Sequence, residues 1–427
     1  MNSYETLASY MMKPETRAHL KTLYGGGEEL LQKQSDRYAA LLKMHEETFH
    51  SDGKIAFFSA PGRTEIGGNH TDHNNGRVLA ASVNLDILCV AGLRDDMTVR
   101  FFSEGRRPIT MDLNTLDARE SEKGTTVALI RGVAAGMKDA GYQIGGFDAV
   151  VTSDVASGGG LSSSAAIEIM LTAVFDGLYN RFDMPYVLRA QIGKRAENEY
   201  FGKPSGLLDQ MASAAGGLVT IDFKDTADPV IRDLSFDFAK EGYALAVVKT
   251  GGSHADLTDQ YAAIPAEMKQ VAGFFGRNVL RDVTENELTG HMDELRARFS
   301  DRAIMRAFHF IRENDRVPEQ VSALEENRTG DFLRLICDSG RSSFMYLQNV
   351  YADNRDQSLS LALCIAETLL KDRGAWRVHG GGFAGTTLNF VPLDMVDEFA
   401  ETMNRAFGKD ACIILNIRPS GADMIGL

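Results

Sequence analysis

A run of three glycines and three serines lies between a predicted strand and a predicted helix, and it constrains the fold more than any other segment. It reads Gly158-Gly159-Gly160-Leu161-Ser162-Ser163-Ser164, directly after the apolar stretch 147–153 and before an apolar helical pattern that begins at about Ala165. Glycines let the backbone approach a ligand closely, and the first N–H groups of a helix have no intrahelical partners. Because the helix dipole adds positive potential there, the run predicts a phosphate-binding site.

The alternative interpretation of this run is a flexible turn that only caps the following helix. Three glycines alone would favour that interpretation, but their position between a strand and a helix favours phosphate. The serine hydroxyls can also bind phosphate oxygens or Mg²⁺. The chain contains no G-x-x-x-x-G-K-[ST] segment, and it lacks the glycine-rich loop and V-A-I-K of protein kinases. The predicted site is therefore neither that of a P-loop NTPase, which the first pattern marks, nor that of a protein kinase.

The size and charge of the chain limit its fold and its partners. Its 427 residues exceed a single ordinary core, so we expect two domains. Acidic residues outnumber basic ones by 59 to 45, and the net charge of −14 disfavours nucleic acid and anionic membranes as partners. No secretory signal or membrane-spanning segment is visible. The four cysteines are far apart and suit reduced thiols, so we expect a cytoplasmic protein.

The hydrophobic pattern mixes strands with helices. Helices are predicted in residues 1–50, with a break at Gly25-Gly26-Gly27, at 125–141, and through most of 265–375. Strands are predicted at 55–60, 78–83, 87–93, 147–153, 218–223, 243–248, 387–391 and 411–415. Pro61-Gly62 is expected to end the first of these strands. Since strands and helices do not alternate strictly, the pattern indicates an α+β fold rather than a doubly wound sheet.

Four segments together resemble the GHMP kinases, the family of galactokinase, homoserine kinase, mevalonate kinase and phosphomevalonate kinase. Leu161-Ser162-Ser163-Ser164-Ala165 is similar to the phosphate loop of that family, and His379-Gly380-Gly381-Gly382-Phe383-Ala384-Gly385 to its last glycine-rich motif. Residues 62–74 (GRTEIGGNHTDHN) are similar to the galactokinase signature GR-x-N-x-I-G-E-H-T-D-Y-N. Residues 197–210 are similar to the galactokinase stretch that ends in C-G-x-M-D-Q. The last two segments are specific to the galactokinases, so the chain most closely resembles that branch.

The resemblance implies a fold and a division into domains. The fold is the two-domain α+β GHMP kinase fold, with ATP bound between the domains. Residues 1–222 correspond to the ribosomal-protein-S5-domain-2-like N-terminal domain, which carries the phosphate loop and a helical extension over residues 1–50. Residues 223–427 correspond to a ferredoxin-like α+β C-terminal domain.

The resemblance also implies the catalytic residues. Asp209 matches the aspartate that accepts the proton of the sugar's anomeric hydroxyl, and Arg63 matches the arginine beside it. A guanidinium there keeps the carboxylate ionised and stabilises charge on the transferred group. Taken alone, Asp209 would be interpreted as a surface or helix-capping carboxylate. Its place between Gly206 and Gln210 in the matched segment favours catalysis.

Substrate, nucleotide and metal contacts follow from the same segments. Sugar contacts are implied for Asn69, His70, Asp72, Gly206 and Tyr261. Taken alone, Tyr261 would be a packing residue, but it keeps the family's spacing from His254. The loop 158–164 is implied to bind ATP. Ser164 and Glu197 are implied to bind Mg²⁺, because a hydroxyl and a carboxylate suit this hard cation; the alternative for Glu197 is a helix-surface residue. The expected partners are a sugar and ATP, in a monomer or weak homo-oligomer.

The chain departs from the galactokinase pattern at several positions. Asn69 stands where the signature has the Glu that reads the sugar's C6 hydroxyl, and Glu65 stands where the signature has Asn. Ser205 replaces a Cys, and Ile264 stands where an Arg is common. A Glu would repel a carboxylate at C6 and an Asn would tolerate it, so galacturonic acid is an alternative substrate.

The sequence thus predicts an enzyme that phosphorylates the anomeric C1 hydroxyl of galactose with ATP, giving galactose 1-phosphate and ADP. A kinase for galacturonic acid or another galactose-like sugar is the first alternative. A non-catalytic regulator that binds galactose and ATP is the second, but the complete Ser164-Ala165-Ala166 segment and Asp209 argue against it. Mevalonate or homoserine phosphorylation is disfavoured by His70-Thr71-Asp72, since those substrates lack the vicinal hydroxyls that this segment would bind.

Overall fold

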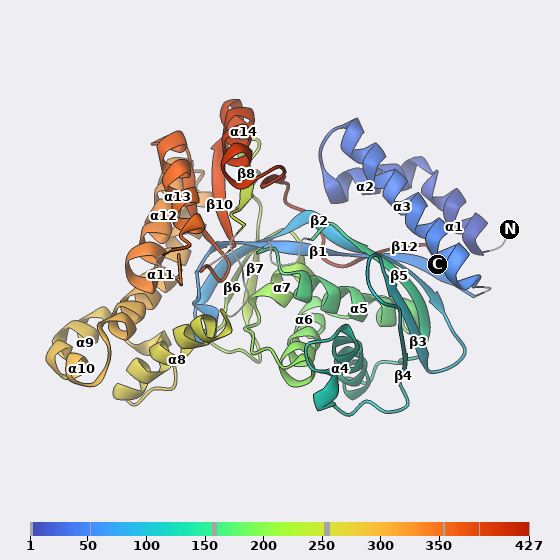
Figure 1. Cartoon of the computed structure of the whole chain (residues 1–427), viewed down its shortest axis with the longest axis horizontal. Helices are drawn as coiled ribbons and strands as arrows, with labels where there is room; N and C mark the ends of the chain where they lie inside the picture. Colours follow the sequence, from blue (N-terminus) through green and yellow to red (C-terminus); the bar gives the residue numbers. More distant parts are fainter. Residues whose placement is uncertain are drawn as a thin grey trace.

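A long antiparallel hairpin, formed by strands β1 (Ile55–Gly67) and β2 (Arg77–Leu93), runs through the centre of the structure (Figure 1). Both strands are buried along almost their whole length, and strands covered on both faces have near-continuous apolar sequences. The structure is a computed structural model that describes residues 3–51, 53–155, 160–251, 257–352, 355–383 and 385–426.

The hairpin belongs to the first sheet, whose strand order is β12-β1-β2-β5-β3-β4, with β6 and β7 added beside the first half of β2. Its other strands are β3 (Thr98–Ser103), β4 (Ile109–Asp112), β5 (Phe147–Ser153), β6 (Leu218–Asp222), β7 (Val230–Leu234) and β12 (Asp423–Ile425). The described pairs are antiparallel except β3 with β5. The last strand of the chain therefore lies beside the first.

Helices cover both faces of the first sheet (Figure 1). One face carries α1 (Ser3–Met11), α2 (Pro14–Tyr24) and α3 (Glu28–Phe49). The other carries α4 (Thr126–Asp139), α5 (Ser163–Tyr179), α6 (Tyr186–Arg195) and α7 (Leu208–Ala215). Successive side chains of a strand point to opposite faces. Phe57 therefore packs under the N-terminal helices, and Phe58 packs into the core on the opposite face.

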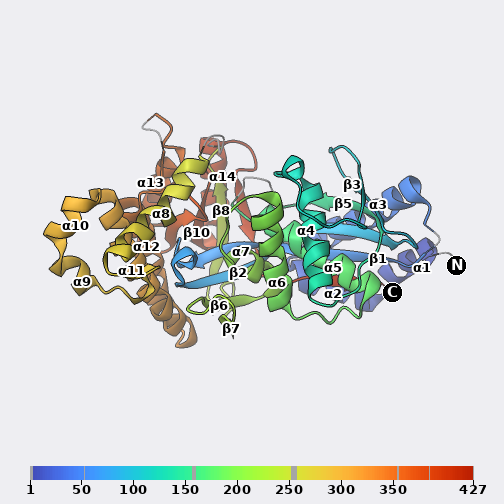
Figure 2. The same ribbon diagram turned by 90° about the horizontal axis from the view of Figure 1, so that it is seen from below.

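The second sheet has the strand order β11-β8-β10-β9, and its described pairs are antiparallel. Its strands are β8 (Tyr243–Lys249), β9 (Ala375–His379), β10 (Thr386–Pro392) and β11 (Cys412–Leu415). The helices beside it are α11 (Asp301–Glu325), α12 (Thr329–Ser342), α13 (Ser358–Leu370) and α14 (Val396–Phe407). Helices α8 (Thr258–Phe274), α9 (Glu285–Gly290) and α10 (Met292–Arg298) share an apolar core with α11. Figure 2 shows α9 and α10 at the opposite end of the molecule from α1.

The predicted α+β class is confirmed, and the predicted strands are found. The segments predicted as separate strands at 78–83 and 87–93 form one continuous strand, β2. The predicted end of the first strand at Pro61-Gly62 is wrong, because β1 continues to Gly67. The register with β2 shifts between Pro61 and Arg63, so a bulge accommodates the proline, which has no N–H to donate. The Arg63 N–H then donates to Leu161 O of the phosphate loop at 3.2 Å.

The domain boundary at residues 222 and 223 stays a prediction. Strand β6 ends at Asp222, while β7 extends the first sheet and β12 returns to it from the end of the chain. Among the residues that the structure describes, no helix is long and apolar enough to cross a membrane.

Candidate active site

The phosphate loop is held between the two sheets. A Cβ at Gly160 would lie 2.2 Å from Thr386 Oγ1 of β10, so only glycine fits against the second sheet. Gly160 also has a φ of 71°, and Ser162 takes a left-handed φ of 55° directly before α5. Gly158 and Gly159 lie outside the described residues. The described part of the loop therefore lies against β10 and turns sharply into the start of α5.

The first turn of α5 presents an open helix N-terminus. Ser163 and Ser164 lie there and are partly exposed. In the described part of the loop, no side chain caps this helix, so the N–H groups of its first turn are available. Together with the helix dipole, these groups suit a phosphate.

Arg63 and Asp209 meet although they are 146 positions apart in the sequence. Arg63 Nε donates to Asp209 Oδ1 at 2.6 Å, and Arg63 Nη1 donates to Gly160 O. Ser162 Oγ donates to the other carboxylate oxygen, Asp209 Oδ2. The Arg63 side chain is 6% exposed, whereas that of Asp209 is 30% exposed. The carboxylate is thus tied to the phosphate loop but stays open on one side.

Asp209 is held in its ionised form. Burial alone would raise the pKa of Asp209, but the Arg63 guanidinium and the Ser162 hydroxyl outweigh burial and hold the pKa below its ordinary value of 3.8. An ionised carboxylate with an open side can accept a proton from a hydroxyl placed beside it.

Asp72 and Gly206, two of the predicted sugar contacts, lie against each other. A Cβ at Gly206 would lie 1.8 Å from Asp72 Oδ2, so a side chain there would push the carboxylate out of its place. Asp72 begins the short 3-10 turn η1 (Asp72–Asn74), and its Oδ1 accepts from His73 N at 3.0 Å. The Asp72 carboxylate therefore faces the segment that leads into Asp209.

His70 and Tyr261, two further predicted sugar contacts, pack on the last glycine motif. His70 Nε2 donates to Gly381 O at 3.0 Å, and Tyr261 Oη donates to Gly382 O at 2.9 Å. A Cβ at Gly381 would lie 2.6 Å from the Tyr261 ring. Burial and the neighbouring His73 lower the pKa of His70 to about 3, so its ring is neutral and Nε2 carries the proton. The first and last motifs therefore meet, and their contacts with a sugar stay predictions.

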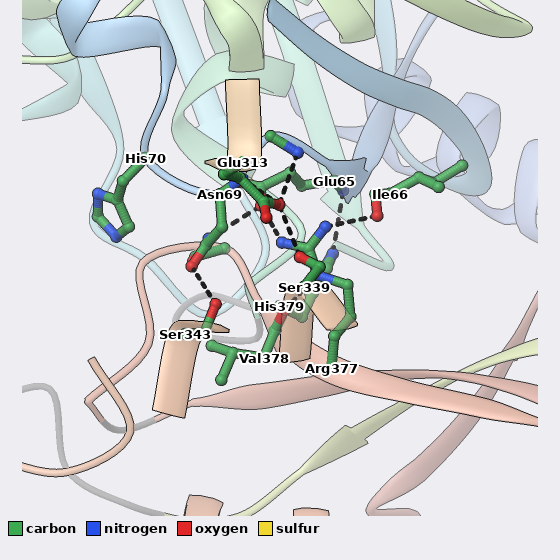
Figure 3. Close-up of polar contacts among 12 residues, drawn as sticks. Glu65, Ile66, Asn69, His70, Glu313, Ser339, Ser343, Arg377, Val378 and His379 are labelled. Atoms are coloured by element: carbon green, nitrogen blue, oxygen red, sulfur yellow. Dashed lines mark hydrogen bonds and ion pairs between the residues drawn. The ribbon is translucent and has the colours of Figure 1, made fainter. Parts of the chain in front are cut away.

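The Asn69 side chain is fully buried and points toward the segment that contains Ser343 (Figure 3). Its Nδ2 donates to Glu65 Oε1 at 2.9 Å and to Gly380 O at 2.8 Å. Its predicted contact with the C6 hydroxyl of a sugar stays a prediction.

Ser164 and Glu197, the predicted Mg²⁺ ligands, are bridged by the ammonium of Lys203. Lys203 Nζ lies 2.7 Å from Glu197 Oε1 and 3.5 Å from Ser164 Oγ. Since one cationic group contacts both oxygens, the hydroxyl and the carboxylate face the same point, and their chemistry fits Mg²⁺. The Lys203 side chain is 53% exposed and has room to move away. Within the described residues, no cluster of three His, Cys, Asp or Glu side chains offers a metal site.

A second buried carboxyl group, Glu168, lies behind Glu197. Gln210 Nε2 donates to Glu197 Oε2 and to Glu168 Oε2, both at 2.9 Å. Burial and the charge of Glu197 raise the pKa of Glu168 well above its ordinary value, so both favour its protonated form. Gln210 therefore holds the carboxylate of Glu197, one of the two predicted Mg²⁺ ligands, in place.

Lys203, His379 and Glu313 are among the residues at the site that were not predicted as functional. His379 directly precedes the last glycine motif, and its Nε2 accepts from Glu65 N at 3.3 Å. Burial and the charge of Arg63 lower the pKa of His379 well below its ordinary value, so this ring is neutral. Glu313 Oε1 accepts from Asn69 N at 3.2 Å. Glu313 lies within a long helix, where no motif signals its role, whereas Lys203 lies within the matched segment 197–210.

Comparison with known proteins gives the family. The galactokinase galactose-binding signature matches residues 43–93, and the GHMP kinases N terminal domain matches residues 128–217. The galactokinase of Streptomyces coelicolor is 31% identical over 350 residues, which cover 82% of this chain and 88% of that protein. The galactokinase of Glaesserella parasuis is 31% identical over 369 residues, which cover 83% and 90%.

Solved structures share the fold. The crystal structure of Lactococcus lactis galactokinase complexed with galactose matches with a TM-score of 0.80 at 24% identity, covering 90% of this chain and 99% of that one. The structure of Methanococcus jannaschii mevalonate kinase matches with a TM-score of 0.61 at 15% identity, covering 86% and 99%. The predicted GHMP kinase fold is therefore confirmed, and the protein is a kinase of the GHMP class that uses ATP.

Within that class, the chain belongs to the galactokinase family. The sequence prediction of a sugar kinase is confirmed.

Proposed function

We propose that this kinase transfers the γ-phosphoryl group of ATP to the anomeric C1 hydroxyl of galactose, giving galactose 1-phosphate and ADP. The observation that carries the proposal is the Asp209 carboxylate, which contacts Arg63 and Ser162 and lies open beside the phosphate loop. A sugar hydroxyl placed on that open side would lie between a base and the terminal phosphate of a bound nucleotide. The similarity to two curated galactokinases supports galactose as the sugar.

Asp209 is the general base in this mechanism. It accepts the proton of the C1 hydroxyl as that oxygen bonds to the γ-phosphorus and the bond to the ADP oxygen breaks. The anomeric hydroxyl is more acidic than an ordinary alcohol, so a carboxylate with a low pKa suffices. Arg63 keeps Asp209 ionised and oriented, and its guanidinium stabilises negative charge on the transferred group.

The phosphates of ATP would bind the loop 158–164 and the first turn of α5. Ser164 and Glu197 would hold Mg²⁺, which supplies positive charge to the phosphate oxygens when it is bound. Gln210 keeps Glu197 in place, and the Lys203 ammonium would have to leave Glu197 for the cation to bind.

Asp72 would accept hydrogen bonds from two vicinal sugar hydroxyls. A sugar with a misplaced hydroxyl would leave this partly buried acceptor unpaired, which costs binding energy. Gly206 leaves room for the Asp72 carboxylate, while His70 and Tyr261 form the wall that the last glycine motif supports. Asn69 lies on the same segment, next to His70.

We also propose that the enzyme works in the cytoplasm as a monomer or weak homo-oligomer. Cys89, Cys337, Cys364 and Cys412 are all free thiols, which suits a reducing compartment.

A coupled ADP-release assay with MgATP tests the proposed function. The panel holds galactose, galacturonic acid, N-acetylgalactosamine, glucose, arabinose and mevalonate. We expect turnover with galactose and none with glucose or mevalonate. Turnover of mevalonate, or silence with a protein that binds galactose in calorimetry, would contradict the proposal; the latter would favour a non-catalytic regulator.

A further inference from the structure

Two of the departures from the galactokinase signature touch each other. The signature has Asn at position 65 and Glu at position 69, whereas this chain has Glu65 and Asn69. Asn69 Nδ2 donates to Glu65 Oε1 at 2.9 Å, and both side chains are buried (Figure 3). The chain therefore keeps one carboxylate and one amide in this space but exchanges their positions.

Glu65 forms a buried ion pair that connects β1 with the second sheet. Its Oε1 accepts from Arg377 Nη2 at 2.5 Å, and Arg377 Nη1 donates to Ile66 O at 2.5 Å. Arg377 is fully buried, and in the described part of the chain Glu65 is the carboxylate with which it pairs. Removing that carboxylate would leave a buried guanidinium without its counter-charge, which strongly destabilises a fold. With Asn at position 69, position 65 therefore requires an acid.

The hydrogen-bonding capacity of the Asn69 amide is filled by the protein. Nδ2 donates to the Glu65 carboxylate and to Gly380 O, which both only accept, so the orientation of the amide is fixed. Oδ1 accepts from Ser343 Oγ at 3.2 Å and from Asn349 Nδ2 at 3.0 Å. Two donated and two accepted bonds are the full capacity of a primary amide. Asn69 therefore has no hydrogen bond left for a substrate hydroxyl.

A carboxylate at position 69 would conflict with Glu65. The amide nitrogen of Asn69 lies 2.9 Å from Glu65 Oε1, so a carboxylate oxygen in its place would set two negative charges side by side. It would also face Gly380 O with no proton to donate. An acid at position 65 thus requires an amide at position 69. A chain with an acid at position 69 would in turn need an amide at position 65.

We propose that Glu65 and Asn69 form a transposed specificity pair. The signature has its carboxylate at position 69, at the C6 end of the sugar, whereas this chain has it at position 65, where it pairs with Arg377. The pair consists of positioning residues, and the inference rests on the proposed function. Because no side chain at position 69 is free to bind the C6 hydroxyl, the enzyme discriminates weakly at C6. Galactose and 6-deoxygalactose are then comparable substrates for phosphorylation at C1.

The activity test compares kcat/KM for galactose and 6-deoxygalactose in the wild type and in the exchanged variant E65N/N69E. One hydrogen bond to a carboxylate is worth about 10- to 100-fold in discrimination, and the wild type lacks that bond. We expect a ratio within about threefold for the wild type and a shift of about tenfold or more toward galactose in E65N/N69E. A wild type that rejects 6-deoxygalactose by about 100-fold would overturn the proposal. An unchanged ratio in the exchanged variant would also overturn it.

A stability test does not depend on activity. Urea unfolding of wild type, E65N, N69E and E65N/N69E forms a double-mutant cycle. Each single variant should unfold at a lower urea midpoint, because E65N leaves Arg377 unpaired and N69E opposes two carboxylates. The exchanged variant should recover much of that loss. If the losses in urea midpoint of the two single variants simply add in the exchanged variant, or if the exchanged variant does not fold, the proposed coupling is wrong.

The matched control is E313Q/N69E, which has the same formal charge as the exchanged variant. Glu313 is another buried carboxylate of this region, but it accepts from the backbone N–H groups of Gly68 and Asn69 and not from the Asn69 amide. The control should show no recovery. If galactose is not phosphorylated at all, the proposed function fails while the unfolding cycle still decides whether the pair is coupled.

Discussion

Two aspartates, Asp86 and Asp209, both pair with arginines but lie in different surroundings. Asp86 is fully buried and accepts from Arg37 Nη1 at 2.6 Å, from Arg418 Nη1 at 3.3 Å and from two hydroxyl groups. It joins the N-terminal helices to the first sheet and to the end of the chain. Asp209 accepts from a single arginine, Arg63, and one serine hydroxyl, and it keeps 30% of its side chain exposed.

The comparison of Asp86 with Asp209 shows that pairing with arginine does not by itself indicate a catalytic role. At both aspartates burial would raise the pKa, and neighbouring arginines outweigh it and hold the pKa below the ordinary value. A lowered pKa therefore does not distinguish a structural carboxylate from a catalytic one. The distinction is that donors surround Asp86 under the N-terminal helices, whereas Asp209 has an open side next to the phosphate loop. We accordingly expect stability effects at Asp86 and activity effects at Asp209.

The largest expected effect is on the activity of Asp209→Asn. The amide cannot accept the proton of the C1 hydroxyl, so kcat should fall by about 10²- to 10⁴-fold. Binding of ATP and galactose, measured by calorimetry, should persist, and the unfolding midpoint should fall less than that of a variant at Asp86, because Asp209 pairs with one arginine and is partly exposed. An active D209N enzyme would break the comparison, because Asp209 would then be structural like Asp86.

The next effect is on the stability of Asp86→Asn. Removing this charge leaves the fully buried Arg418 without its counter-charge and leaves Arg37 paired with Asp154 alone, which costs about 3–5 kcal/mol in free energy of unfolding. Urea unfolding measures the loss, and kcat per folded molecule should not change. D96N is the matched control: Asp96 pairs with Arg94 at the surface, so its loss should leave the urea midpoint unchanged. A D86N protein as stable as the wild type would contradict the structural role.

A smaller effect is the pH dependence of stability. The pKa of Asp86 is lower in the folded protein than its ordinary value of 3.8. Its stabilisation is therefore complete above that value and is lost as the pH falls through the folded pKa. A group of this kind contributes a slope of up to about 1.4 kcal/mol per pH unit. Urea unfolding between pH 3 and pH 6 should show a shallower acid slope for D86N than for the wild type, and equal slopes would contradict this assignment.

The smallest effect is expected at Lys203, which pairs with Glu197 at an exposed edge of the site. Its ammonium would compete with Mg²⁺ for the proposed ligands Glu197 and Ser164, but the side chain is half-exposed and the pair is weak. Lys203→Met should lower the Mg²⁺ concentration needed for half-maximal ATP binding by about two- to fivefold, the range of a pair worth under 1 kcal/mol. Titration calorimetry at fixed ATP measures this. A higher Mg²⁺ requirement would mean that Lys203 assists the nucleotide instead.

The motifs of the sequence predicted the centre of the site. The resemblance placed Arg63 beside Asp209, and the structure has them in contact although the strand that carries Arg63 was expected to end before it. Local rules favour a strand end at Pro61-Gly62, and they fail because a bulge in the pairing with β2 removes the need for a proline N–H.

The contacts that support the site were not predictable from local sequence. Glu313 and Asn349 lie outside any motif, and only the packing of α11 and its neighbours against β1 brings them to Asn69. The sequence marked Glu65 and Asn69 as two separate departures. Their coupling depends on Arg377, more than 300 positions away, so it becomes visible only when β9 is placed beside β1.

Analysis of the reaction product by ³¹P nuclear magnetic resonance tests the central claim most directly. Wild-type enzyme with MgATP and galactose should produce ADP and one sugar phosphate, whose phosphorus couples to the anomeric proton, and D209N should produce neither in the same reaction time. A phosphate on any other hydroxyl, or ADP without a sugar phosphate, would contradict the claim that Asp209 directs phosphoryl transfer to C1 of galactose.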